Sequence, residues 1–166
     1  RSSHRRGCWD RRASQQRGAG EQGMDYAYAQ FFTGRQDTGI MDHYRAHLSD
    51  GFPGRTLSAV CVSAAPTRPE ALEQSLMAAN FRVSLGTGRP VTFVTASQMD
   101  AETRSLLTSY VLSNEDTIFV GDYDEVADKL TAFQDAHHVD ELMLISYIDN
   151  VQTKVERYRQ LAKRLI

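Results

Sequence analysis

The sequence has no long hydrophobic run and only two cysteines, and these two features exclude several classes of protein. No stretch approaches the ~18 consecutive apolar residues that a membrane-spanning helix needs. The N-terminal residues lack the apolar segment of a secretory signal peptide, so a cytoplasmic protein is expected. Cys8 and Cys61 form no CxxC pair and no metal-ligand spacing. They allow one disulfide, although reduced thiols are the simpler interpretation.

The chain also lacks a strong excess of charge of either sign. Its formal net charge is −2, which predicts no general attraction to nucleic acid or to a membrane surface. With 166 residues, 41% of them hydrophobic, it can bury one substantial core. A complete (β/α)8 barrel typically needs about 250 residues, so this chain is too short for one.

The first 22 residues differ in composition from the rest. Residues 1–23 contain no Val, Ile, Leu or Phe, and six arginines face only Asp10 and Glu21. Such a segment buries too little apolar surface to offset its ordering entropy. It could be a basic arm for an acidic partner, a transit-type peptide, or sequence that does not belong to the fold, such as an out-of-frame stretch. We favour the third interpretation and expect 1–22 to be an unstructured leader outside the fold.

From residue 23 onward, short apolar runs alternate with helical patterns. Strands are predicted at 25–32, 57–65, 117–120 and 142–145, because these runs are apolar or aromatic with little polar alternation. Helices are predicted at 38–48, after Thr67, at 100–112, after Asp122 and from Val151, where apolar residues recur at helical spacing. Thr67 with Glu70 and Asp122 with Glu125 have the spacing of capping boxes. Alternation of this kind favours an α/β fold with parallel strands and right-handed crossovers.

Several phrases of the sequence resemble the luciferase-like flavin-dependent monooxygenases, in the order and spacing of that family. Residues 23–32 (GMDYAYAQFF) resemble its sixth strand, and 57–67 its seventh strand with the turn that follows. Residues 120–126 (VGDYDEV) are similar to the family phrase Val-Gly-Thr-Pro-Glu-Glu, with Asp122-Tyr123 in place of Thr-Pro, and 140–144 (DELML) resemble strand eight. The resemblance covers about residues 23–166.

This resemblance implies an incomplete TIM barrel, in which the chain supplies strands six to eight with their helices. Strands one to five, with the active-site His of the family, would lie outside this sequence. The implied activity is oxygenation by reduced FMN and O₂ of an aldehyde or another small organic substrate, with FMN preferred over a deazaflavin. The alternative is a flavin-binding or structural fragment that is inactive alone. Exposed strand edges would make the chain a homo-oligomer or poorly soluble.

The resemblance also points to cofactor-binding residues, although no catalytic acid or base can be nominated. Gln30 stands near the C-terminal end of the first predicted strand, the active-site end in such a barrel, where its amide could hydrogen-bond the flavin ring; a solvated strand end is the alternative. Tyr28 and Phe31 would line the same pocket, or simply belong to the core. Gly121 precedes a helix N-terminus that could attract a phosphate, although a tight turn explains it as well.

Two other patterns are weaker. Residues 86–89 (GTGR) resemble a phosphate loop only faintly, because they do not connect a strand to a helix. The resemblance to the luciferase-like family implies a mobile lid in this region instead. His43 and His47 have the spacing of two metal ligands on a helix, but no third ligand accompanies them. We therefore predict no metal site.

Overall fold

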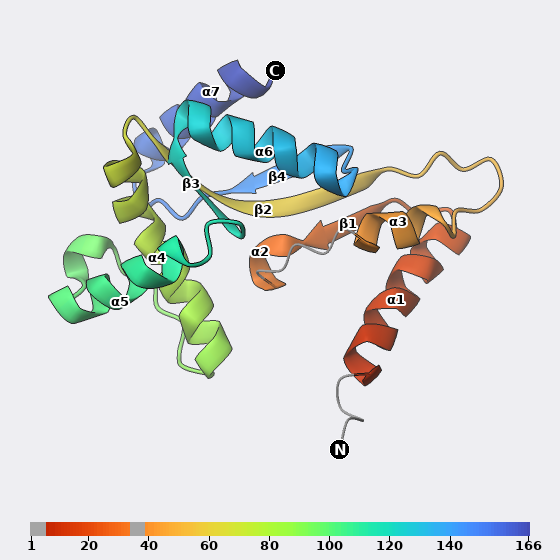
Figure 1. Ribbon diagram of the computed structural model, residues 1–166, viewed down its shortest axis with the longest axis horizontal. Coiled ribbons are helices and arrows are strands. Elements are labelled where there is room, and N and C mark those ends of the chain that lie inside the picture. The colour runs from red at the N-terminus through yellow and green to blue at the C-terminus, as the bar shows by residue number, and fades with distance from the viewer. Residues whose placement is uncertain (1–5, 34–38) are drawn as a thin grey trace.

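The computed structural model describes residues 6–33 and 39–166, which form an α/β fold around one parallel sheet (Figure 1). The strands of the sheet are β1 (Tyr26–Ala29), β2 (Thr56–Ala65), β3 (Ile118–Asp122) and β4 (Glu141–Ile145). The helices are α1 (Arg6–Glu21), α2 (Gln30–Thr33), α3 (Gly39–Arg45), α4 (Arg68–Thr87), α5 (Ala101–Leu112), α6 (Tyr123–His137) and α7 (Val151–Leu165), with a 3₁₀ turn, η1, at Ala96–Gln98. The predicted alternation of strands and helices is confirmed.

The long strand β2 is the centre of the sheet, and the other three strands pair with it in parallel. Ala59 lies between Ala29 of β1 and Met143 of β4, so these two strands occupy opposite edges of β2. Cys61 lies between Ile118 of β3 and Ile145 of β4. Strand β3 therefore continues along the same edge of β2 where β1 ends. The predicted parallel, side-by-side arrangement of β1, β2 and β4 is confirmed.

Both faces of β2 are covered, which explains its nearly unbroken apolar run. Val60, Val62 and Ala64 pack with α3, α6 and α7 on one face. Cys61 and Ala65 pack with α4, η1 and α5 on the other. Figure 1 shows α6 and α7 on one side of the sheet and α5 on the opposite side. The insertion between β2 and β3 thus forms a layer of its own against the sheet.

Helix caps follow the sequence closely, although neither expected capping box closes. Thr67 accepts a hydrogen bond from the Glu70 N–H at the start of α4, and Asp122 accepts from the N–H groups of Asp124 and Glu125 at the start of α6. The side chains of Glu70 and Glu125 instead form ion pairs with arginines. Gly88, the second glycine of residues 86–89, ends α4 in the left-handed conformation at φ 68°, so this segment is a helix terminus.

The prediction of an unstructured leader is wrong for residues 6–21, which form α1. This helix contacts α3, and the Ser49 N–H donates to the Gly20 carbonyl at 3.0 Å. A Cβ at Gly20 would lie 2.6 Å from the His47 carbonyl oxygen, so only glycine permits this approach. The buried residues described for this helix are Gln16 and Gly20, so an inventory of large apolar side chains does not detect its packing. The domain boundary at residue 22 stays a prediction.

Three further expectations are corrected by the structure. The first strand ends at Ala29, and Gln30 begins the short helix α2. The strand predicted to be buried at 142–145 is only partly so, since Met143 is 52% exposed and no described strand covers the outer edge of β4. Leu106, which the helical apolar spacing of residues 100–112 predicts to be buried, is exposed on α5.

Candidate functional site

The carboxyl ends of the parallel strands meet at one edge of the sheet, which is where βα folds place their active sites. Gln30 and Phe31 follow β1, and Ser146 and Tyr147 follow β4. Helix α4 and the segment after it lie at the same edge, because α4 contacts both β2 and β3. Groups from four separate parts of the chain can therefore converge there.

Gln30 is fully buried at the junction between β1 and β3. Its Nε2 donates a hydrogen bond to the Thr117 carbonyl at 3.3 Å. Ala29 pairs with Ala59 and Ile118 pairs with Cys61, so β1 ends and β3 begins along the same edge of β2. The Gln30 amide connects the two strands at this point. The alternative of a solvated strand end is wrong for this residue.

The guanidinium of Arg82 completes the same junction from α4. Its Nε donates to the Phe31 carbonyl at 3.1 Å, its Nη1 to the Thr117 hydroxyl at 2.9 Å, and its Nη2 to the Thr117 carbonyl at 2.8 Å. Arg82 is buried, and among the described residues no carboxylate lies within ion-pair distance of it. Sequence reasoning missed Arg82, since a lone arginine within a helix carries no local signal.

A row of aromatic rings runs from the end of β1 to the end of β4. Phe32 lies 6.3 Å from Phe81 between ring centroids, and Phe81 lies 5.7 Å from Phe93 and 5.3 Å from Tyr147. The rings of Phe93 and Tyr147 are nearly parallel, at 19°. Phe32 and Phe93 are 57% and 62% exposed, so the row presents ring faces and edges to a ligand.

The β4 end of this row opens into a hollow of about 420 Å³. Its wall includes Met77, Phe93, Thr95, Gln98, Tyr147 and Lys154. A second hollow of about 310 Å³ shares Met77, Thr95 and Tyr147 and extends toward Glu70 and Arg157. Tyr147 is therefore the side chain that links the aromatic row to both hollows. The sequence does not reveal this role, because the neighbours of Tyr147 come from distant parts of the chain.

Two protonation states at this edge are set by burial. Burial raises the pKa of the Tyr147 phenol, and the nearby Cys61 adds to the effect while Arg82 opposes it. The Tyr147 hydroxyl is thus protonated at neutral pH and can donate a hydrogen bond. Burial also raises the pKa of the Cys61 thiol to about 11, against a smaller opposing effect of Arg82. A thiol with so high a pKa is a poor nucleophile, as expected for a core cysteine.

Comparison with known proteins finds similarity to a monooxygenase and to a solved structure of matching fold. N-acetyl-S-alkylcysteine monooxygenase of Bacillus subtilis (strain 168) is 24% identical over 153 residues, covering 89% of this chain and 45% of the relative. The crystal structure of apo-MsnO8 superposes with a TM-score of 0.69 and 27% identity, over 92% of this chain and 48% of that one. The chain is related to the luciferase-like flavin-dependent monooxygenases.

A more distant structure agrees on the fold. The oxygenating constituent of 3,6-diketocamphane monooxygenase from Pseudomonas putida, solved in complex with FMN, matches with a TM-score of 0.55 and 16% identity, over 90% of this chain and 44% of that one. No family model matches the chain. The chain spans about half the length of these luciferase-like relatives. No helix among the described residues is long and apolar enough to cross a membrane.

The four residues predicted for the luciferase-like cofactor site do not all lie together. Gln30 and Phe31 lie at the carboxyl edge, where Phe31 packs with the cluster beneath α4. Tyr28 points to the opposite face and packs with the cluster beneath α3, α6 and α7. Tyr28 and Phe31 therefore cannot form one wall. Gly121 lies farther along β3, where its neighbours are charged side chains.

Gly121 makes room for a cluster of four charges. The Glu125 carboxylate pairs with Arg68 and, at 2.9 Å, with Lys129, while Glu115 pairs with the same two cations at 2.5 and 3.2 Å. A Cβ at Gly121 would lie 2.6 Å from Glu125 Cδ. The two carboxylates balance the two cations, so this position offers a phosphate no unpaired positive charge among the described residues.

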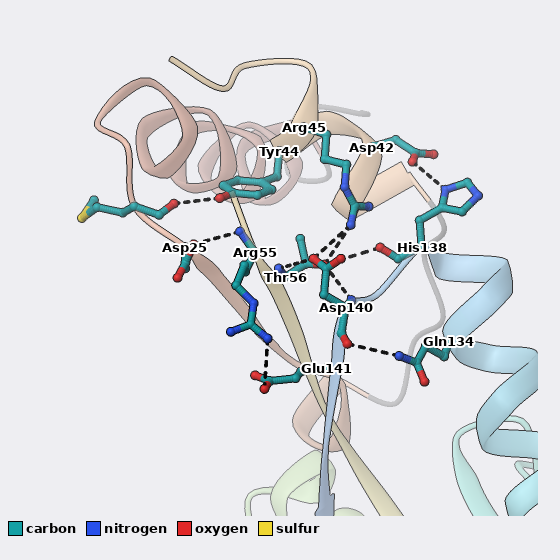
Figure 2. Close-up of polar contacts among 11 residues, drawn as sticks. Asp25, Asp42, Tyr44, Arg45, Arg55, Thr56, Gln134, His138, Asp140 and Glu141 are labelled. Carbon is teal, nitrogen blue, oxygen red and sulfur yellow. Dashed lines mark hydrogen bonds and ion pairs between the residues drawn. The ribbon is translucent and has the colours of Figure 1, made fainter. Parts of the chain in front are cut away.

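The opposite, amino-terminal edge of the sheet carries a dense polar network (Figure 2). Asp140 Oδ2 accepts hydrogen bonds from the Thr56 N–H and hydroxyl, both at 2.7 Å, and pairs with Arg45 at 3.2 Å. Arg55 donates its backbone N–H to Asp25 at 2.8 Å and pairs with Glu141 at 3.3 Å. These contacts tie together the starts of β1, β2 and β4. In βα barrels this edge serves stability and the carboxyl edge serves catalysis.

His43 on α3 and His47 in the turn after it are not arranged as a metal site. The His47 ring donates from Nδ1 to the His43 carbonyl at 2.8 Å, and the two rings lie 4.5 Å apart between centroids. Within the described part of the chain, no group of three or more His, Cys, Asp or Glu side chains could hold a metal ion.

Proposed function

We propose that this chain carries the C-terminal half of a luciferase-like (β/α)8 barrel and acts in a monooxygenase reaction of reduced FMN and O₂ with a small organic substrate. The observation that supports this most strongly is the position of the aromatic row. It lies at the carboxyl ends of the parallel strands β1 and β4, the edge at which this fold holds its ligands. The similarity to apo-MsnO8 over 92% of the chain supports the same assignment.

The residues at the β1 end of the row suit a flavin ring. Phe32 is exposed beside Phe31, with 4.2 Å between their ring centroids, and aromatic faces stack favourably on planar rings. Gln30 and Arg82 fix the backbone that carries both rings through Thr117 and the Phe31 carbonyl. When bound there, the flavin supplies the reactivity toward O₂. We assign Gln30 a positioning role, whereas cofactor roles for Tyr28 and Gly121 stay predictions.

The residues at the β4 end suit the substrate. The hollow beside Tyr147 combines an apolar wall with the hydroxyl of that residue, which burial keeps protonated. Such a hydroxyl can donate to a carbonyl oxygen and orient an aldehyde, a ketone or an amide. Covering the exposed Phe93 ring would exclude water from the reacting groups. The name of the Bacillus subtilis relative adds N-acylated thioethers to the candidate substrates.

We propose that the cofactor is FMN rather than a deazaflavin, that the protein works in the cytoplasm, and that it self-associates. Among the described residues, no strand pairs with the outer edge of β1 or of β4. Unpaired edges of this kind combine with other strands.

Titration of the chain with FMN, and with reduced FMN under anaerobic conditions, tests the flavin assignment through the change in flavin fluorescence. We expect micromolar binding, a free energy of roughly −8 kcal/mol. Phe32→Leu should weaken binding several-fold, because it removes the exposed ring. Leu106→Ala, which truncates an equally exposed side chain on α5, should have no effect. Absence of binding would contradict the proposal and leave a structural fragment.

Oxygen consumption then separates an enzyme from a flavin-binding protein. With reduced flavin bound, a monooxygenase consumes O₂ faster when a substrate such as a long-chain aldehyde is added. An uptake rate that no aldehyde, ketone or thioether changes would argue for flavin binding without catalysis. Tyr147→Phe keeps the ring and removes the hydroxyl, so it should lower the substrate-dependent rate and leave the flavin affinity unchanged.

A further inference from the structure

Arg82 places a positive charge in the interior of the fold without a carboxylate to balance it. The residue is 8% exposed, and its hydrogen bonds go to the Phe31 carbonyl, the Thr117 carbonyl and the Thr117 hydroxyl, which are all neutral groups. Among residues 6–33 and 39–166, no Asp or Glu side chain lies within ion-pair distance of its guanidinium. This group stays charged in proteins, so the neutral acceptors solvate a charge that they do not neutralise.

Less deeply buried arginines of this chain have the counter-charge that Arg82 lacks. Arg45, Arg68 and Arg157 each form an ion pair with a carboxylate. Taking a charge out of water is costly, and buried charges are therefore usually paired with a charge of the opposite sign. The exception at Arg82 stands at the carboxyl edge of the sheet, where the aromatic row offers exposed rings to a ligand. A negatively charged ligand at this edge would supply the missing counter-charge.

The charge of Arg82 acts on groups beyond its hydrogen-bonding partners. It lowers the pKa of the Cys61 thiol and of the Tyr147 phenol, in both cases against the larger effect of burial. Its chain neighbour Phe81 lies 6.3 Å from the exposed Phe32 between ring centroids. Solvent and salt screen buried charges much less than exposed ones. A planar ligand stacked on Phe32 therefore lies within the field of Arg82.

The two redox forms of FMN differ in the charge on which this field acts. The ring of reduced FMN loses a proton near neutral pH and then carries a negative charge, whereas the ring of oxidised FMN is neutral. The phosphate is common to both forms and contributes equally to the affinity of each. A protein charge near the flavin ring is one means by which proteins tune this cofactor. An exposed aromatic ring beside a buried cation thus fits the reduced form better.

We propose that Arg82 makes this site prefer reduced FMN over oxidised FMN, through the uncompensated positive charge that it holds beside the Phe31 carbonyl. The guanidinium does not contact the flavin, so Arg82 is a positioning residue whose charge acts across the backbone that carries Phe31 and Phe32. This inference rests on the proposed function, because it concerns the flavin of the same site, and it adds which redox form is held. By linkage, tighter binding of the reduced form also raises the midpoint potential of bound flavin above that of free FMN.

Anaerobic calorimetric titrations of the whole chain with oxidised and with reduced FMN give the ratio of the two dissociation constants. We expect reduced FMN to bind roughly tenfold more tightly, the order of effect of one unit charge acting through a protein interior. Arg82→Met should remove this preference, while Arg82→Lys, which keeps the charge and loses the fork of hydrogen bonds, should retain most of it. Arg159→Met is the matched control, since it deletes the same charge from a 70% exposed side chain on α7 and should leave the ratio unchanged.

A merely structural role of Arg82 would lower both affinities together and leave their ratio as it is. An unchanged ratio in Arg82→Met, or equal binding of the two forms by the unaltered protein, would overturn the inference. If Arg82→Met does not fold, the absorbance of reduced FMN bound to the unaltered protein provides a second measurement. A nearby cation lowers the pKa at which the reduced ring loses its proton, so this pKa should be lower for bound than for free reduced FMN. An equal or higher value would contradict the inference.

These results separate failure of the inference from failure of the proposed function. Binding of both redox forms with equal affinity refutes the role of Arg82 and leaves the flavin assignment intact. Binding of neither form refutes the flavin assignment, and the role of Arg82 with it. Preferential binding of reduced FMN that Arg82→Met abolishes and Arg159→Met preserves supports both.

Discussion

Asp140 shows how one side chain connects the starts of several strands. It precedes β4, yet its carboxylate accepts from Thr56 at the start of β2 and pairs with Arg45 of α3. Burial by itself would raise the pKa of the Asp140 carboxyl. The hydrogen bonds from Thr56 and the nearby Arg45 charge outweigh burial and hold this pKa below its usual value. The folded state therefore stabilises the charged carboxylate of Asp140 relative to its protonated form.

The first prediction concerns Asp140→Asn. At neutral pH it should lower the free energy of unfolding by about 1–2 kcal/mol, the size of charge-assisted hydrogen bonds at a site that is 41% exposed. A depressed carboxyl pKa stabilises the fold above the unfolded pKa of about 3.9 and loses this effect as the pH falls through the folded pKa. The difference between variant and parent should thus shrink below about pH 4. Urea unfolding at several pH values measures it, with exposed Asp128→Asn as control; a constant difference would contradict the role of the charge.

The second prediction compares two glycines. Gly121→Ala should destabilise the fold by about 1–3 kcal/mol, because the new methyl group displaces Glu125 from Arg68 and Lys129. Gly86→Ala on α4 meets nothing within 4 Å and should stabilise by up to about 1 kcal/mol through helix propensity. Thermal unfolding of both variants measures the contrast. If Gly121→Ala is neutral for stability but weakens FMN binding, Gly121 belongs to the cofactor site after all.

At the scale of elements, a helix or strand can be predicted from the sequence when the residues that cause it to form lie within the element itself. The strands β2 and β3 and the helices that begin after Thr67, Asp100 and Asp122 could be predicted, since an apolar run or a cap residue lies within the element itself. Helix α1 could not, because its packing depends on close contact of Gly20 with a segment 27 residues away along the chain. The Arg82 junction depends likewise on Thr117, which only tertiary folding brings near.

The third prediction tests the N-terminal cap of α6. Asp122→Ala removes the side chain that accepts two backbone N–H groups at the start of α6 and should cost about 1 kcal/mol. Asp122→Asn keeps an oxygen acceptor and should cost clearly less. Denaturant unfolding of the two variants measures the difference. Equal losses would show that charge at this position, rather than capping, stabilises the helix.

At the scale of the whole molecule, no described strand pairs with the outer edges of β1 and β4. On the partly exposed strand β4, Met143 faces away from the α6–α7 layer. The fourth prediction is that the chain self-associates through these edges, and that Met143→Lys shifts it toward monomer, since a charge on an edge strand opposes strand pairing. Sedimentation velocity at several concentrations measures both. A monodisperse monomer with a cooperative thermal transition would contradict the prediction.

The central claim is that flavin binds at the carboxyl end of β1, beside the hollow at the end of β4. Amide hydrogen exchange with and without reduced FMN tests it most directly, because the two edges of the sheet are resolved in one experiment. The account predicts new protection around residues 30–32 and 80–82, and none at Asp25, Arg55 or Asp140. Protection at the amino-terminal edge instead, or no change at saturating flavin, would contradict it.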